Sequence, residues 1–223
     1  MKKILAIALV IALLSTLAIG TTLSYFKDTA YEKDTMTVGN VKITQTVTSG
    51  STALRPYIGT IPADNFVDAN NAVTKNVTVT NIGSESAYIR TLFAFEAVNQ
   101  ANPVGTKVHA DYNKTDGVGT WASEGEITVG TVKYYVYSFT YTNEVLGGNT
   151  TTVASLEKIA LDCSVENDFA DQIVGDYDIL IVSQAVQSTG FTAIGTKSAA
   201  EVAFEQAFGA LNASWFAAPQ QSN

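Results

Sequence analysis

The sequence predicts an all-β protein, an antiparallel sandwich with one short helix near the C-terminus. Three observations lead to this fold class. β-branched and aromatic residues dominate the 223-residue chain, only four prolines occur, and short turns rich in Gly, Asn and Ser recur between apolar runs. Strands at this spacing, without helical patterns between them, are typical of two packed antiparallel sheets. About eight strands in two sheets would form a jelly roll.

A secretory signal precedes the first expected strand. Lys2 and Lys3 lead into an uncharged apolar run from Ile4 to Ile19, and small residues follow at 20–24. A basic segment, an apolar segment and a small-residue stretch are the parts of a cleavable signal. The apolar run is shorter than the roughly 20 residues that a bilayer span requires. We therefore expect a secreted protein whose mature form does not span the membrane.

Six stretches carry the alternation or the β-branched and aromatic content of strands. We expect strands over 36–47, 76–82, 87–98, 129–142, 152–165 and 177–187. Between the third and fourth of these, residues 99–126 are rich in Asn, Gly, Asp and Thr. We expect a long surface excursion there, because polar segments of this length are often functional or mobile loops.

One helix is expected over 198–211. Ser198 is a good N-cap, and Glu201 three residues later completes a capping-box pattern. Apolar residues line one side of the helix, so we expect it to pack against the sandwich. An amphipathic helix that binds a partner or a membrane surface is the alternative, although the helix has no Lys or Arg to attract anionic lipid.

Composition excludes some partners and leaves others open. The formal net charge is −8, and removal of Lys2 and Lys3 with the signal makes it about −10. The absence of any basic cluster argues against nucleic-acid binding. Cys163 is the single cysteine, so no intramolecular disulfide can form. We expect Cys163 to be a small buried side chain on a strand, with a nucleophile or an intermolecular bridge as alternatives.

We find no pattern of catalytic or cofactor-binding residues. His109 is the only histidine and is expected on a surface loop, whereas a zincin helix needs two histidines and a catalytic zinc three protein ligands. A Cys163–His109 dyad and a glycosidase-type carboxylate pair stay open but have no supporting pattern. Acidic residues gather at 166–171 and 176–178, where a solvated loop is expected and weak extracellular calcium binding is the alternative.

Three short motifs follow one another along the chain. Residues 20–29 read GTTLSYFKDT and lead into TMTVGNVKI at 35–43; residues 75–84 read KNVTVTNIGS; and residues 179–191 read ILIVSQAVQSTGF. In this order they resemble the TasA/camelysin family, in which a small-residue stretch precedes an aromatic-x-Asp motif and a Gly-containing strand. The resemblance implies a jelly-roll fold and export by a dedicated SipW-type signal peptidase.

The resemblance also implies a division of the chain. Cleavage would fall after Ser24 and leave Tyr25 as the new N-terminus. The signal peptide would then be 1–24, followed by an extended donor segment at 25–37, a jelly-roll domain at 38–218 and a tail at 219–223.

Family members assemble into extracellular fibres of the biofilm matrix, and the resemblance implies the same for this chain. The partner would be another copy, joined head-to-tail, whose sheet receives the N-terminal segment as an added strand. Tyr25, Phe26 and Met36 are the apolar anchors that we expect in this segment. Alternatively, the segment is a flexible leader or pairs within its own domain.

Two other functions stay open as alternatives. Camelysin-like relatives carry a metallopeptidase label, but one histidine and no zinc motif leave us expecting no enzyme activity. A cell-surface adhesin or carbohydrate-binding module would depend on the excursion at 99–126 and on Trp121.

Overall fold

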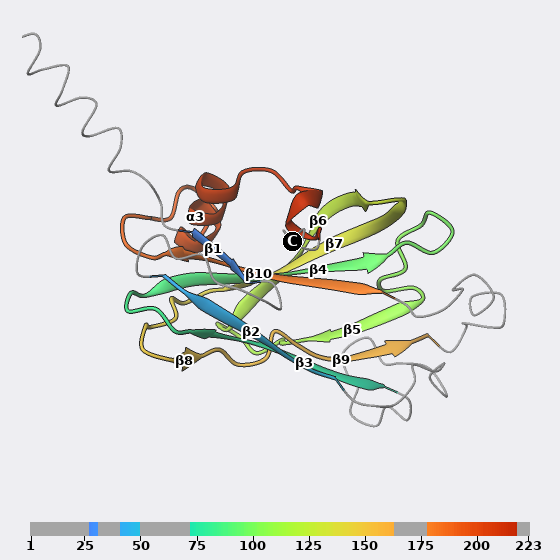
Figure 1. Ribbon diagram of the computed structural model, residues 1–223, viewed down its shortest axis with the longest axis horizontal. Coiled ribbons are helices and arrows are strands. Elements are labelled where there is room, and N and C mark those ends of the chain that lie inside the picture. Colours follow the sequence, from blue (N-terminus) through green and yellow to red (C-terminus); the bar gives the residue numbers. More distant parts are fainter. Residues whose placement is uncertain (1–26, 31–40, 50–71, 163–177, 218–223) are drawn as a thin grey trace, which may run out of the picture.

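The computed structural model describes residues 27–30, 41–49, 72–162 and 178–217. They form two antiparallel sheets packed face to face, with a helical layer over one of them (Figure 1). In spatial order, the first sheet contains β1 (Lys27–Ala30), β10 (Ile179–Gln187), β4 (Ala87–Glu96), β7 (Val132–Tyr141) and β6 (Gly119–Val129). The second sheet contains β2 (Ile43–Ser49), β3 (Val73–Asn81), β9 (Leu156–Leu161) and β5 (Val108–Tyr112), and β8 (Thr150–Thr151) also pairs with β3. The predicted all-β sandwich is confirmed.

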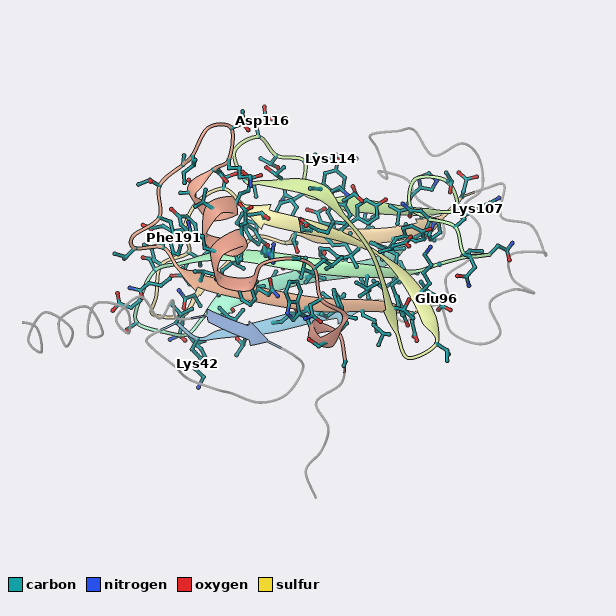
Figure 2. All side chains as sticks on the ribbon, turned by 90° about the horizontal axis from the view of Figure 1, so that it is seen from above. Lys42, Glu96, Lys107, Lys114, Asp116 and Phe191 are labelled. Carbon is teal, nitrogen blue, oxygen red and sulfur yellow. The ribbon has the colours of Figure 1, made fainter. Side chains whose placement is uncertain are left out.

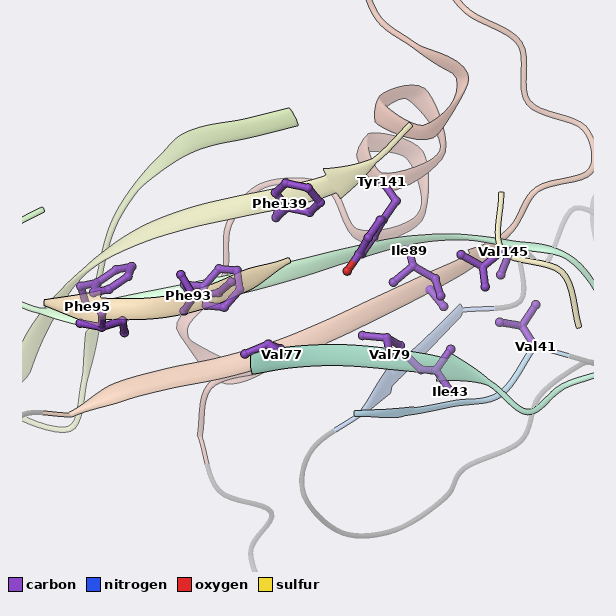
Figure 3. Packing of buried hydrophobic residues seen from close by; sticks show 14 of the residues in the cluster. Val41, Ile43, Val77, Val79, Ile89, Phe93, Phe95, Phe139, Tyr141 and Val145 are labelled. Atoms are coloured by element: carbon purple, nitrogen blue, oxygen red, sulfur yellow. The ribbon is translucent and has the colours of Figure 1, made fainter. Parts of the chain in front are cut away.

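The core lies between the two sheets and is made by alternate residues of each strand. Ile89, Phe93 and Phe95 project from β4 toward Val77 and Val79 of β3 (Figure 3), and all five are fully buried. Burying a side chain of this size stabilises the fold by about 1.5–3 kcal/mol. This alternation explains why the strands at the centre of each sheet are readable from the sequence.

Four predicted strands agree with the structure to within a few residues, namely those that correspond to β3, β4, β7 and β10. Two others are shorter than expected. β2 begins only at Ile43, and β9 occupies Leu156–Leu161, the middle of the stretch predicted at 152–165. Cys163 lies outside the described residues, so its placement on a strand stays a prediction. The jelly-roll connectivity stays a prediction as well.

The prediction of a long surface excursion at 99–126 is wrong. This segment supplies β5 and most of β6, the strands that end the second and the first sheet. Because β6 is an edge strand, most of its side chains are exposed, and its polar composition resembles that of a loop. Turns remain before and between these strands: one at Asn99 and Gln100, with φ of 51° and 64°, and others that contain Gly105 and Gly117, with φ of 80° and 78°.

The predicted helix is present as α3 (Ala199–Phe208), two to three residues shorter at its end than expected. Its capping box is complete: the Glu201 amide donates to Ser198 Oγ at 3.2 Å, and the Ser198 amide donates to Glu201 Oε2 at 2.7 Å. The helix packs on the outer face of the first sheet, where Phe204 is buried and Phe191 lies beside it (Figure 2).

The short 3₁₀ helix η1 (Ala213–Trp215) follows α3 and covers the next part of the same face. Phe216 is buried there with Leu92 and Val182 of the sheet. Within the described ranges, no helix is long and apolar enough to cross a membrane.

Candidate functional site

The outer edge of the first sheet is formed by β1, which comes from the segment predicted to act as a donor strand. β1 runs antiparallel to β10 over four residue pairs, from Lys27 opposite Val186 to Ala30 opposite Ser183. β10 has nine residues, and no described residue pairs with the outer edge of its first four, Ile179–Val182. The described residues therefore cover this edge along only part of its length.

The strand that receives β1 is held far more firmly than β1 itself. β10 pairs with β4 through all nine of its residues. Its side chains from Val182 to Val186 are buried, with Ala185 in the core and Val186 beneath α3. A four-residue strand has little stability of its own and depends on the sheet that accepts it. At this edge, a firmly held strand, β10, accepts a short strand, β1, that another strand could replace.

A chain of hydroxyl and amide groups supports β10 from inside the sandwich. Ser183 Oγ donates to Gln45 Oε1 at 2.6 Å and lies 3.0 Å from Thr91 Oγ1. Gln45 Nε2 also donates to the Ile181 carbonyl at 3.4 Å. Gln45 belongs to β2, so these bonds join the second sheet to the strand that accepts β1. Buried polar groups of this kind fix one arrangement, because leaving any of them unpaired is costly.

A second polar pair supports the edge from the outer face. Arg90 Nε on β4 donates to Gln184 Oε1 on β10 at 2.7 Å. Burial lowers the pKa of the Arg90 guanidinium to about 10, and the charge of Glu124 opposes this shift. The Gln184 amide nitrogen is buried and has no hydrogen-bond partner among the described residues. On β1, Thr29 is the residue in register with Gln184.

Arg90 is also held by aromatic rings from the helical layer. Its Cζ atom lies 4.7 Å from the ring centroid of Phe204, and 5.7 Å from those of Phe208 and Trp215. A guanidinium over an aromatic face is attracted to it, the more so when water is excluded. Arg90 therefore connects β4, β10, α3 and η1. No sequence pattern predicts this role, because the partners of a single Arg in an apolar strand come from distant parts of the chain.

The predicted site residues at the N-terminus are not among those described. Ser24, Tyr25, Phe26 and Met36 all lie outside the described ranges. Their roles in cleavage and in anchoring the donor segment therefore stay predictions. The same holds for the acidic stretch 166–171 and its proposed weak calcium binding; Asp178 is described, but no group of three metal-ligating side chains occurs within the described part of the chain.

His109 does not lie on a surface loop, as the sequence suggested, but on β5. Its Nε2 atom is 2.9 Å from Asp162 Oδ2, and the two side chains are 21% and 22% exposed. The pairing of β5 with β9 brings the histidine beside the residue that follows β9. The polar composition around His109 concealed this strand, because β5 ends its sheet.

Trp121 is not displayed on a loop. It lies on β6 with its ring stacked on Tyr112 at 4.8 Å and on Tyr137 at 5.4 Å, and 5.3 Å from the ring of Phe93. These rings pack against the core between the sheets. The two features on which the adhesin alternative depended are therefore a pair of edge strands and an aromatic cluster.

No protein-family model matches this chain, and a search of curated proteins finds no match either. The case for a function therefore comes from the edge formed by β1 and β10.

Proposed function

We propose that this chain is a secreted structural subunit that polymerises head-to-tail into extracellular matrix fibres by exchanging its N-terminal strand between copies. The observation that carries the proposal is the antiparallel pairing of β1 with the edge of β10. β1 lies within the segment 25–37, which the resemblance to fibre-forming proteins identifies as the donor.

Strand exchange is favoured here because the pairing consists of main-chain hydrogen bonds. The same bonds to β10 can be made by β1 of the same chain or by β1 of a neighbour. In the single chain, β1 lies on its own domain, which we interpret as the closed form. Transfer to a neighbour costs little, since only four residue pairs must separate before they form again.

The head-to-tail direction follows from the asymmetry of this contact. Each copy offers one β1 and one β10 edge, and the two surfaces differ. A contact between different surfaces leaves one of each free at the ends, so further copies are added and an open filament grows. The edge of Ile179–Val182, with which no described residue pairs, would accept further residues of a donor segment. No feature of the described residues favours a secreted metallopeptidase, and the segment 99–126 and Trp121 do not form the surface loop on which the adhesin alternative depended.

Deletion of the donor segment tests the proposal. A chain beginning at residue 38 should remain a folded monomer and lose the ability to form filaments in negative-stain electron microscopy. A chain beginning at Tyr25 that lacks only the tail at 219–223 is the matched control, and it should polymerise normally. Undiminished filaments from the chain without residues 25–37 would rule out strand exchange through this segment.

A further inference from the structure

A hollow of about 530 Å³ lies on the outer face of the first sheet, on the side of α3 away from β1. Its floor is formed by β4, β7 and β6, and its walls by α3 and the segment that leads into the helix. The hollow does not include β1 or β10, although Arg90, which lines it, also donates to Gln184 of β10. Ligand sites in proteins have volumes in this range.

The floor is a row of polar side chains fixed by strand register. Arg90 on β4 is paired with Thr140 on β7, which is paired with Thr120 on β6. Ser138 and Ala122 form the next pair along β7 and β6. Because paired residues point to the same face of a sheet, the hydroxyl groups and the guanidinium lie beside one another. All five residues line the hollow.

Arg90 is a buried cation on which the charge of Glu124 acts, but within the described residues it forms no close ion pair. It is 9% exposed, and one face of its guanidinium is near the Phe204 ring. Within the described part of the chain, the side chain of Arg90 makes one hydrogen bond, from Nε to Gln184 Oε1. No carboxylate there lies within ion-pair distance of the guanidinium. Both Nη groups, with four N–H donors, are therefore available to a ligand. The lowered pKa has the same cause, the loss of water around the cation.

The walls limit what kind of anion can enter. Glu124, Glu201 and Glu205 line the hollow. Their carboxylates already accept hydrogen bonds from Ser138, Ser198 and Lys197 respectively, and each keeps further lone pairs. With the two cations Arg90 and Lys197, these three carboxylates give the lining a net charge of −1, so they disfavour a dianion such as sulfate or phosphate more than a monoanion. They accept hydrogen bonds from neutral hydroxyl groups, which favours a ligand with a single carboxylate and several hydroxyls.

We propose that the hollow binds an acidic sugar, a uronate ring whose carboxylate pairs with the Nη groups of Arg90. A carboxylate matches the planar fork of a guanidinium and forms strong, charge-assisted hydrogen bonds with it. The sugar hydroxyls would bond to Thr120, Thr140 and the carboxylate of Glu124. An extracellular fibre subunit with such a site would bind carboxylated polysaccharide, but the site itself does not depend on fibre formation.

Calorimetric titration of the purified chain with D-glucuronate tests this proposal. D-glucose lacks the carboxylate, and acetate has a carboxylate but no hydroxyls, so these two probes separate the contribution of the carboxylate from that of the hydroxyls. We expect saturable binding of glucuronate that is roughly 10-fold or more tighter than binding of either comparison ligand, as expected for charge-assisted bonds to a buried cation. Absence of saturable binding, or equal binding of glucose or acetate, would overturn the assignment.

A variant that adds a large side chain to the floor of the hollow tests the site without changing Arg90. Loss of Arg90 would also remove its contacts with α3 and η1. Ala122→Phe places a ring in the hollow from an exposed position on β6, so the fold should be retained. We expect it to weaken glucuronate binding by roughly 10-fold or more. Thr128→Phe adds the same ring at an exposed position of β6 outside the hollow and should leave binding unchanged. Equal binding by the two variants would locate any sugar site elsewhere.

Discussion

Asn81, at the end of β3, joins its strand to the turn that follows and to a distant backbone segment. Its Nδ2 atom donates to the carbonyls of Glu85 and Val145, at 2.8 and 2.9 Å, and its Oδ1 accepts from the Gly83 amide at 3.1 Å. The residue is fully buried. It therefore holds the turn between β3 and β4 against the segment that follows β7.

Asn81→Ala should lower the free energy of unfolding by about 3 kcal/mol, because it removes three hydrogen bonds made by a fully buried side chain. Denaturant unfolding followed by circular dichroism measures the change. Asn143→Ala removes an exposed asparagine from the segment after β7 and should change stability by less than about 0.5 kcal/mol. Similar losses in the two variants would show that the Asn81 bonds contribute little.

The sequence places Asn81 in the motif at 75–84 but could not reveal which groups its side chain binds. Its partner at Val145 is far along the chain, and only the folded structure brings the two together. Arg90 and Gln184 were hidden for the same reason. Their contact depends on the register between β4 and β10, and no local pattern records register.

At the scale of elements, the capping box of α3 was readable because its groups lie within one turn of the chain. Ser198 and Glu201 satisfy each other's backbone amides, as the spacing predicted.

The edge strands β5 and β6 were missed because one side of each lacks a neighbour and is rich in polar residues. Sequence alternation thus identifies strands that are covered on both sides better than strands at an edge.

Ser198→Ala should destabilise the protein by about 1 kcal/mol, since the first turn of α3 loses its side-chain acceptor. Thermal unfolding monitors the change. Ser214→Ala alters an exposed serine in η1 whose hydroxyl makes no hydrogen bond among the described residues, and it should have almost no effect. If the two variants melt at the same temperature, the cap does not stabilise the docked helix.

At the scale of the whole molecule, the first sheet carries both proposed activities, on opposite sides of α3. β1 lies along one edge of this sheet, and the hollow lies toward the other edge, over β7 and β6. Arg90 is the one residue that belongs to both regions, since it bonds to β10 and lines the hollow. Subunits joined through β1 would therefore leave the hollow open along a fibre.

Intermolecular cross-linking between β1 and β10 tests strand exchange most directly. Lys27 and Val186 are in register, and paired residues of antiparallel strands lie about 4.5–5.5 Å apart, within reach of a disulfide. Lys27→Cys and Val186→Cys are placed in separate chains, with Cys163→Ser in both. A third chain carries both new cysteines and can close its own β1 onto its own β10.

We predict that the two single-cysteine chains, mixed and oxidised, give disulfide-linked dimers and filaments in which one chain's β1 is bonded to the other's β10. The chain with both cysteines, oxidised while monomeric, should stay monomeric and form filaments only after reduction. Filaments from the closed, oxidised chain, or filaments without any cross-link between the mixed chains, would contradict strand exchange.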